Sequence, residues 1–435
     1  MHLLRRHWLA VTLAVLGLVY VALLAVINRE PAAAPTEIYF ADRITDAHRV
    51  LIERYNRLHA GKVRVVPIDF PNAEFTTNER KEILARSLRG EGDGIDLLAV
   101  DVIWVQRFAK WCEPLGEHFT SDELQRILPV ALASCYSDSM LMAVPFDLVQ
   151  GVLYYREDLV RALPGGDRVL KSLEAPISWP DFIALHREYR GHGPFYVFPA
   201  AEYEGLICSF IELLLGLQGD YFEAHGFDFV TPEARQSLGL LVDLVQKYHA
   251  APPVVTSLTE VPSYEYFLQN DGLFLRGWTS YDRDFKASAY DTAREAQLRR
   301  VPVPYFPNGR PASVFGGWNL MVSRFSAKKD EAMDFMKFLL SDDAQEVVYA
   351  SGGYLPVVKS FYADTAVARK YPEVKALHAF MQSGVTRPAG KDYTKYSKIM
   401  ATYFSQAIRG RLPVERALEI TTRDIRVEQA LGRIR

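Results

Sequence analysis

The chain has 435 residues, of which 49% are hydrophobic and 12% aromatic, and its formal net charge is −3. One hydrophobic core does not serve a chain of this length, so we expect two lobes or domains. The near-neutral charge and the lack of a basic block argue against a nucleic-acid-binding surface.

Motifs for metal binding and for catalysis are missing from the sequence. The ten histidines show no HExxH pattern, the three cysteines form no CxxC, and no GxSxG occurs. The glycines of RGEGDGID follow a helical pattern and precede a strand, which is the reverse of the order in a phosphate-binding loop. The sequence therefore predicts no metal, no cofactor and no catalytic residue.

Residues 1–36 have the pattern of a signal or membrane anchor followed by a linker. Residues 8–27 are 20 consecutive residues without a charge, behind Arg5 and Arg6, and a helix of this length spans about 30 Å. The basic start places the N-terminus in the cytoplasm and the body outside. We predict an uncleaved anchor in the cytoplasmic membrane, and the alternative is secretion after cleavage near residues 32–34.

Strands and helices then alternate along the chain. EIYFAD and KVRVVPIDF have strand patterns, a helix is expected around Glu79 to Leu88, and the third strand, IDLLAVD, ends at Asp101. In open α/β sheets ligands lie beyond the carboxyl ends of the strands. Asp101 is therefore a candidate ligand-binding residue, with helix N-capping as the alternative role.

The stretch from Pro311 to Pro356 predicts a strand followed by two helices. Side chains alternate from Ser313 to Ser323, Ser326 and Ser341 are placed to cap the helices, and Gly352 and Gly353 end the second helix. Within the strand, Gly316 and Gly317 lack a Cβ, so a ligand could approach the backbone beside the flat ring of Trp318. The alternatives are a β-bulge and a core tryptophan.

Several segments together resemble one protein family. The segments are GGWN with GGYLP, VDVIWVQRFAKWCEPLGE, VPFDLVQGVLYYREDLV, AEYEGLICSFIELLLGLQGDYF and RPAGKDYTKYSKIM. They resemble the extracellular solute-binding proteins of ABC importers, family 1, and among these the sugar-binding branch for trehalose and maltose. The resemblance extends from Glu37 to Leu418.

The resemblance implies an α/β fold of the two-lobed periplasmic binding protein type, type II, with three crossings between the lobes. Residues 37–145 and 302–323 would form the amino lobe, and residues 146–301 and 324–435 the carboxy lobe. The second crossing is expected after Val301, and the third at Val322 to Ser326.

The implied function is to bind a sugar, in particular a di- or oligosaccharide, between the lobes by hinge closure and to deliver it to the permease subunits of an ABC importer. Such a protein is not an enzyme. A membrane-tethered ligand-binding sensor and a carbohydrate hydrolase are the alternatives, and the hydrolase requires a carboxylate pair about 5 to 10 Å apart.

The resemblance also implies a set of ligand-binding residues. They are Asp101, Trp104, Asp147, Gln150, Tyr203, Glu204, Trp278, Gly316, Gly317, Trp318 and Arg387. Val149-Gln150 stands where sugar-binding relatives often carry an acid, so either Asp147 or Gln150 would substitute for it. The segment RGWT keeps Trp278 but lacks the Asn and Pro that relatives have there.

The three cysteines lead to one further expectation. Export to an oxidising compartment, and a short helical excursion between Cys112 and Cys135, predict a disulfide between these two residues. Cys208 would remain reduced and buried.

Overall fold

A long mixed sheet runs through the protein in the computed structural model, which describes residues 8, 11–12, 14–20, 34–71, 74–285 and 292–434. Its strands have the order β2-β1-β3-β10-β6-β8-β7, while β9 pairs with β6 and β11 pairs with β10. A separate two-stranded sheet joins β4 and β5. The strands are β1 (Thr36–Asp42), β2 (Val63–Asp69), β3 (Leu97–Asp101), β4 (Tyr136–Ser137), β5 (Met140–Leu141), β6 (Val144–Arg156), β7 (Tyr196–Val197), β8 (Phe274–Trp278), β9 (Leu298–Val301), β10 (Ser313–Val322) and β11 (Gly384–Val385).

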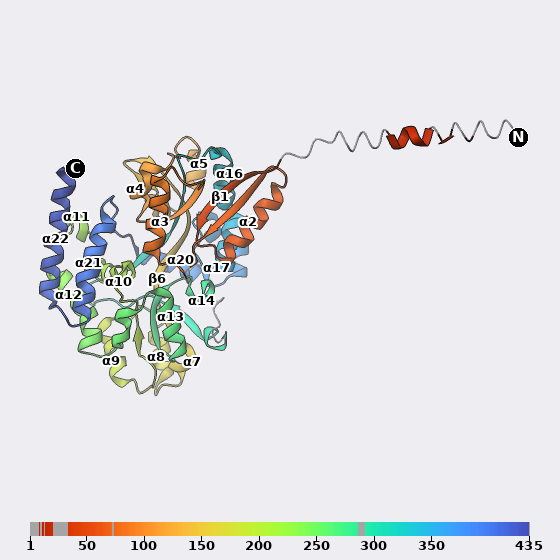
Figure 1. Ribbon diagram of the computed structural model, residues 1–435. Coiled ribbons are helices and arrows are strands. Elements are labelled where there is room, and N and C mark those ends of the chain that lie inside the picture. The colour runs from red at the N-terminus through yellow and green to blue at the C-terminus, as the bar shows by residue number, and fades with distance from the viewer. Residues whose placement is uncertain are drawn as a thin grey trace.

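Two strands, β6 and β10, join the two halves of this sheet. The first part of β6 pairs with β10 and its last part pairs with β8 and β9. Strand β10 starts beside β11 and ends beside β3. Figure 1 shows β6 between the amino-half elements, such as α2 and α3, and the carboxy-half elements, such as α8 and α9. This two-lobed α/β architecture is the predicted one.

The amino half begins as the sequence predicts. Thr45 caps α2 through a capping box with His48, and Thr76 caps α3 in the same way with Glu79. The buried face of α2 includes Leu51 and Tyr55. The helices on this half are α2 (Asp46–Leu58), α3 (Thr77–Arg89), α4 (Val105–Phe108), α5 (Ser121–Gln125), α6 (Pro129–Ala133), α16 (Lys329–Leu339) and α17 (Asp342–Gly352).

The position of α16 and α17 corrects the predicted division of the chain. The prediction placed residues 324–435 in the carboxy lobe, but the ring of Phe335 in α16 lies 4.8 Å from that of Tyr55 in α2 and 5.9 Å from that of Phe40 in β1. The chain enters the amino half within β10 itself, because β10 changes its neighbours along its length. After α17 the chain first stays beside this half, where Val358 bridges Ile127 and the ring of Phe361 lies 5.2 Å from that of Tyr349, and it then continues to β11.

The start of α16 also differs from the prediction. The helix begins at Lys329, and Ser326 does not cap it, because the Ser326 hydroxyl donates to Asp96 and accepts from the backbone N–H of Lys328. The second helix follows the prediction, with Ser341 as the N-cap and Gly353 in a left-handed conformation after Gly352.

The carboxy half is built around α10, which is buried along most of its length. This burial explains its almost continuous apolar sequence, since α12, α21 and β10 all pack against it. The helices of this half are α7 (Glu157–Arg161), α8 (Gly166–Ser172), α9 (Trp179–Glu188), α10 (Glu204–Leu217), α11 (Tyr221–His225), α12 (Pro232–Gln246), α13 (Glu260–Gln269), α14 (Tyr281–Asp284), α15 (Thr292–Glu295), α21 (Tyr393–Ile408) and α22 (Val414–Ile434). Three further helices, α18 (Lys359–Ala363), α19 (Thr365–Lys370) and α20 (Val374–Phe380), form one apolar cluster with α6 and α17.

The predicted membrane helix is only partly covered by the structure. Positions 9, 10, 13 and 21–27 of that span lie outside the described residues. Within the part that is described, no helix has the length and apolar character needed to cross a bilayer.

The predicted disulfide is not formed. Cys112, Cys135 and Cys208 are all free and buried. Cys112 forms a backbone bridge with Ser323 at the end of β10, whereas the Cys135 thiol donates to the carbonyl oxygen of Ala131. Both residues belong to the same buried core, but their thiols remain unbonded to each other.

Candidate functional site

The registers of three neighbouring strands bring predicted site residues onto one face of the sheet. In β10, Trp318 lies opposite Asp101 of β3 and opposite Asp147 of β6. Side chains directly opposite each other on adjacent strands project from the same face. Asp101, Trp318 and Asp147 therefore form a row across the amino half of the sheet.

The row continues into the carboxy half through Gly316 and Trp278. Gly316 lies opposite Val149, and Gly151 lies opposite Trp278 on the other edge of β6. A Cβ at Gly316 would be only 3.0 Å from a Val149 methyl and 3.4 Å from the Trp278 ring. A side chain here would press on Val149 and on the Trp278 ring, so the glycine lets that ring lie close to the backbone of β10.

Gly317 has a different structural role from Gly316. Its φ is +140°, and a Cβ at this position would collide with the carbonyl oxygen of Asp147. Next to it, the ladder between β10 and β6 shifts register between Trp318 and Asn319. The extra residue is Phe146 of β6, so the bulge lies next to the glycine pair and not at it, where the sequence offered it as an alternative.

Arg387 connects predicted site residues from the two halves. Its guanidinium donates to Asp101 at the end of β3 and to Glu204 at the start of α10, each at 2.9 Å. Glu204 also accepts hydrogen bonds from Tyr393 and Ser397 of α21. Arg387 is almost fully buried, with 2% of its side chain exposed. These charge-assisted bonds fix the orientation of both carboxyl groups.

Arg387 keeps its positive charge in this network. Burial alone lowers the pKa of Arg387, but the carboxylates of Asp101 and Glu204 outweigh this effect and raise it well above its ordinary value. Glu204 is the first residue of α10, where the helix dipole also favours a negative charge. Both roles considered for Glu204, at the site and at the helix terminus, are thus compatible.

Trp318 is half-buried between two further side chains. Trp104 meets it edge-on, with ring centroids 5.6 Å apart and planes inclined at 82°. The guanidinium of Arg80, from α3, lies 3.7 Å above the Trp318 ring. Sequence reasoning missed Arg80, because an arginine within an amphipathic helix carries no signal that distinguishes it from a surface residue.

A second charged cluster that sequence reasoning missed lies next to this row. Asp42 contacts His48 at 3.0 Å and Arg80 at 3.4 Å, and Arg43 forms an ion pair with Asp284 at 2.5 Å. Burial raises the pKa of Asp42, but His48 and Arg80 outweigh it and lower the pKa below its usual range. Asp42 ends β1, so the rule that identified Asp101 would also have identified this position.

Asp147 and Gln150, the two proposed replacements for the missing acid, lie on opposite faces of β6. Asp147 is 1% exposed and belongs to the row with Trp318. Gln150 is three residues further along β6, and its side-chain amide donates to Ser313 at 2.8 Å and to the carbonyl oxygen of Phe380 at 3.4 Å. The structure therefore brings Asp147, but not Gln150, to the other predicted residues.

Tyr203 directly precedes α10, and its hydroxyl faces Glu260 of α13. Burial is the main cause that raises the pKa of both Tyr203 and Glu260. The charge of Asp101 also raises the pKa of Glu260. Within the described part of the chain, no group of three or more His, Cys, Asp or Glu residues could hold a metal ion.

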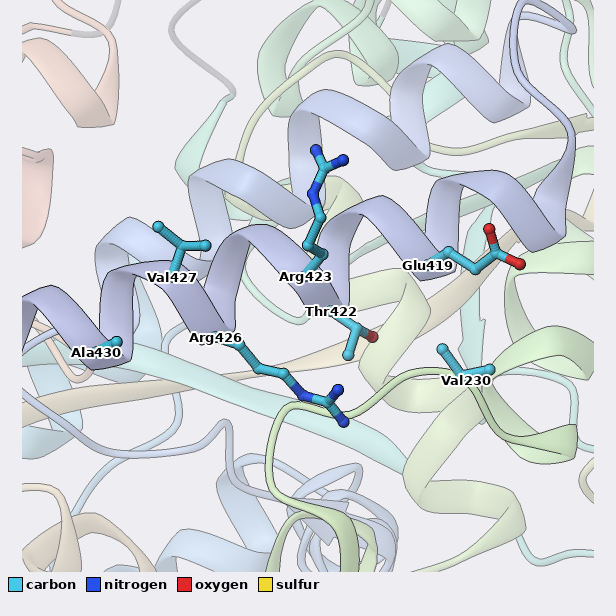
Figure 2. Close-up of a pocket in the computed structure, with 7 residues that line it drawn as sticks. All are labelled: Val230, Glu419, Thr422, Arg423, Arg426, Val427 and Ala430. Carbon is cyan, nitrogen blue, oxygen red and sulfur yellow. The ribbon is translucent and has the colours of Figure 1, made fainter.

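A groove on the surface lies apart from these residues. Figure 2 shows that it runs along α22, with Val230 contributed by the segment before α12. None of the predicted site residues lines it. The lining residues are Val230, Glu419, Thr422, Arg423, Arg426, Val427 and Ala430.

Comparison with known proteins adds independent findings. Residues 42–346 match the family described as bacterial extracellular solute-binding protein. A probable ABC transporter-binding protein of Deinococcus radiodurans is 24% identical over 341 residues, which cover 76% of this chain and 78% of that protein.

Solved structures resemble the whole body of the chain. The maltose-bound MalE3 of T. maritima has a TM-score of 0.80 and 26% sequence identity, covering 90% of this chain and 99% of that protein. The sugar-binding protein MalE of Xanthomonas citri has a TM-score of 0.71 and 19% identity, covering 92% and 98%. The second of these similarities concerns the fold alone.

Proposed function

This chain belongs to the bacterial extracellular solute-binding proteins, and from this membership we propose that it is the extracytoplasmic substrate-binding protein of an ABC importer that takes a sugar between its two halves. The named relative from Deinococcus radiodurans supports the importer. The maltose bound to the T. maritima protein supports a di- or oligosaccharide as ligand.

The observation that carries this proposal is the Asp101–Arg387–Glu204 network. It joins a strand end of the amino half to a helix start of the carboxy half, and Trp318 and Trp278 lie in the same row of the sheet as Asp101. A sugar ring has an apolar C–H face and an equator of hydroxyls. Aromatic rings suit the face, and fixed carboxylates and a guanidinium suit the hydroxyls.

Hinge closure fits the way in which the halves are connected. Strands β6 and β10 pass from one half to the other without a break, so the halves can rotate about them while the strands stay intact. A ligand that contacts residues of both halves stabilises the closed arrangement, which is the state that importer permeases would engage.

A thermal-shift screen against monosaccharides, disaccharides and polyols tests the proposal. A sugar present at 100 times its dissociation constant adds about 2.7 kcal/mol to the stability of the folded protein. We expect a shift with at least one disaccharide, and no such shift for Trp318→Ala, which should remain folded because Trp318 is only half-buried. A shift with amino acids or peptides, and none with any sugar or polyol, would contradict the proposal.

The location and the partners form part of the same proposal. The charge-free residues 8–27 would hold the body outside the cytoplasmic membrane, beside the permease subunits. After a carbonate wash, the full-length protein should remain with the membrane fraction. A mature N-terminus near residue 35, found by mass spectrometry, would instead indicate secretion after cleavage.

A further inference from the structure

Asp147 differs from the other carboxyl groups around the site in having no cation of its own. Asp101 is paired with Arg387, Asp42 with His48 and Arg80, and Asp284 with Arg43. Among the described residues, no ion pair includes Asp147, and its Oδ1 atom is buried without a hydrogen-bond partner. The side chain is 1% exposed. Water therefore does not compensate a charge at this position either.

The groups that surround Asp147 come from several elements. Asp42 and Arg43 face it from the end of β1 and Asp284 from α14, while the Tyr354 hydroxyl faces it from the segment after α17. His48 of α2 and Arg80 of α3 lie behind Asp42. On the other side, the backbone N–H of Trp318 faces the Asp147 carboxyl and opposes the rise in its pKa.

These surroundings favour the neutral acid over the carboxylate. A buried ionised carboxylate without a paired cation is strongly disfavoured, and two neighbouring carboxylates increase the cost. Burial first, and then the charge of Asp42, raise the pKa of Asp147 well above its ordinary value. The neutral acid carries a proton that the unpartnered Oδ1 can present to a ligand.

We propose that Asp147 binds the sugar as a neutral carboxylic acid, donating its O–H from the unpartnered oxygen to a hydroxyl or acetal oxygen of the ligand; this inference rests on the proposed function. A neutral acid at this point selects a ligand atom that accepts a hydrogen bond. A protonated amine cannot accept one, so the site would prefer a neutral sugar to the corresponding amino sugar.

Two substitutions separate the neutral acid from the carboxylate. In Asp147→Asn the side-chain amide still donates a hydrogen bond but cannot ionise, and in Asp147→Leu both properties are lost. Calorimetric titration of wild type and variants with maltose and trehalose, between pH 5 and 9, gives the affinity at each pH. Asp167→Asn serves as the control, because 97% of the Asp167 side chain is exposed.

The expected results have a clear sign. The neutral form predominates below the raised pKa, so the affinity of the wild type should be highest at low pH and should fall as the pH rises through that pKa. Asp147→Asn should bind within about threefold of the wild type at low pH and lack this fall, and Asp147→Leu should bind about tenfold more weakly at every pH. His48 and the other neighbouring groups are the same in the wild type and the Asn variant, so the difference between the two curves isolates Asp147.

Other results would overturn the inference. If the affinity of the wild type increases with pH, or if Asp147→Asn loses as much affinity as Asp147→Leu, the ligand binds the carboxylate. If both variants bind like Asp167→Asn at every pH while the wild type binds sugar, Asp147 does not contact the ligand and the proposed function still stands. If no sugar in the screen binds the wild type at any pH, the proposed function fails, and the inference fails with it.

Discussion

Each half of the sheet presents a tryptophan with an arginine over its ring, but the two arginines are held differently. In the carboxy half, the Arg276 guanidinium lies 4.2 Å from the Trp278 ring. It donates two hydrogen bonds to Glu212 of α10, at 2.7 and 3.2 Å, and both side chains are almost fully buried. Arg276 also lies on the same strand as Trp278. The tryptophan ring and the arginine over it therefore form one rigid unit.

In the amino half, the corresponding arginine is less constrained. Arg80 approaches Trp318 from α3, makes one hydrogen bond of 3.4 Å to Asp42, and shares that carboxylate with His48. In the described part of the chain each guanidinium has one buried nitrogen without a hydrogen-bond partner, Nε in Arg80 and Nη1 in Arg276, so the contrast lies in the bonds that each makes to its carboxylate. From this difference we infer that the Trp278 ring keeps its position, whereas the side chains around Trp318 can rearrange when a ligand enters.

The largest expected effect is the loss of stability when the ion pair between Arg276 and Glu212 is broken. Arg276→Met removes one partner of a buried ion pair and leaves Glu212 without a compensating charge. The free energy of unfolding, measured by urea denaturation, should fall by about 3 to 5 kcal/mol. Adding Glu212→Leu to this variant should recover part of the loss. If Arg276→Met is as stable as the wild type, the arginine of the carboxy half is not held more firmly than that of the amino half.

A smaller effect is expected for sugar affinity in Asp101→Ala. This change removes a charged hydrogen-bonding group from the row and one of the two carboxylates bound to Arg387. The affinity for the sugar found in the screen should fall ten- to a hundredfold, equivalent to about 1.5 to 3 kcal/mol. Calorimetry measures this loss, and a melting temperature shows whether the variant is folded. Unchanged affinity would remove Asp101 from the site.

Arg80→Met tests the amino half directly. Because Asp42 keeps His48 as a partner when Arg80 is removed, we expect this loss to cost about 2 kcal/mol of stability, clearly less than the loss of Arg276. Its main effect should be on sugar affinity, since Trp318 loses the cation above its ring. Equal destabilisation by Arg80→Met and Arg276→Met in the same urea series would contradict the proposed contrast.

The smallest effect is expected for the cysteines. All three thiols are free and buried, and burial raises the pKa of each. Alkylation of the unfolded protein without reductant should therefore label three cysteines. Treatment with reductant should leave the melting temperature unchanged. Labelling of only one cysteine would show that the disulfide predicted from the sequence is formed after all.

The sequence predicts those parts of the fold that local patterns determine. The alternation in β10, the Ser341 cap and the left-handed Gly353 all follow from residue chemistry within a few positions. Asp101 follows from its place at a strand end, and Arg387 from the family resemblance. Both are found in one network.

What the sequence does not predict depends on contacts between distant segments. Arg80 and Asp284 join the site through partners 38 and 241 residues away, and no local pattern encodes such a pairing. The crossing points were misplaced because β10 has the same alternating pattern whichever half it pairs with. The disulfide prediction was wrong for a similar reason, because the spacing of two cysteines in the sequence does not determine how their buried thiols pack.

The exchange of partners along β6 has a consequence for amide hydrogen exchange. On one edge β10 pairs with residues up to Gln150, β9 takes over from Leu153, and β8 covers Gly151 to Tyr155 on the other edge. Backbone amides in the doubly paired segment can exchange with deuterium only when the carboxy half opens. The amides just before it that donate to β10 become accessible when β10 separates from β6, whereas those of Leu148 and Gln150 donate to Leu355 and Thr279. A single strand thus contains adjacent reporters for two different opening events, and their relative protection would show which half of the molecule opens first.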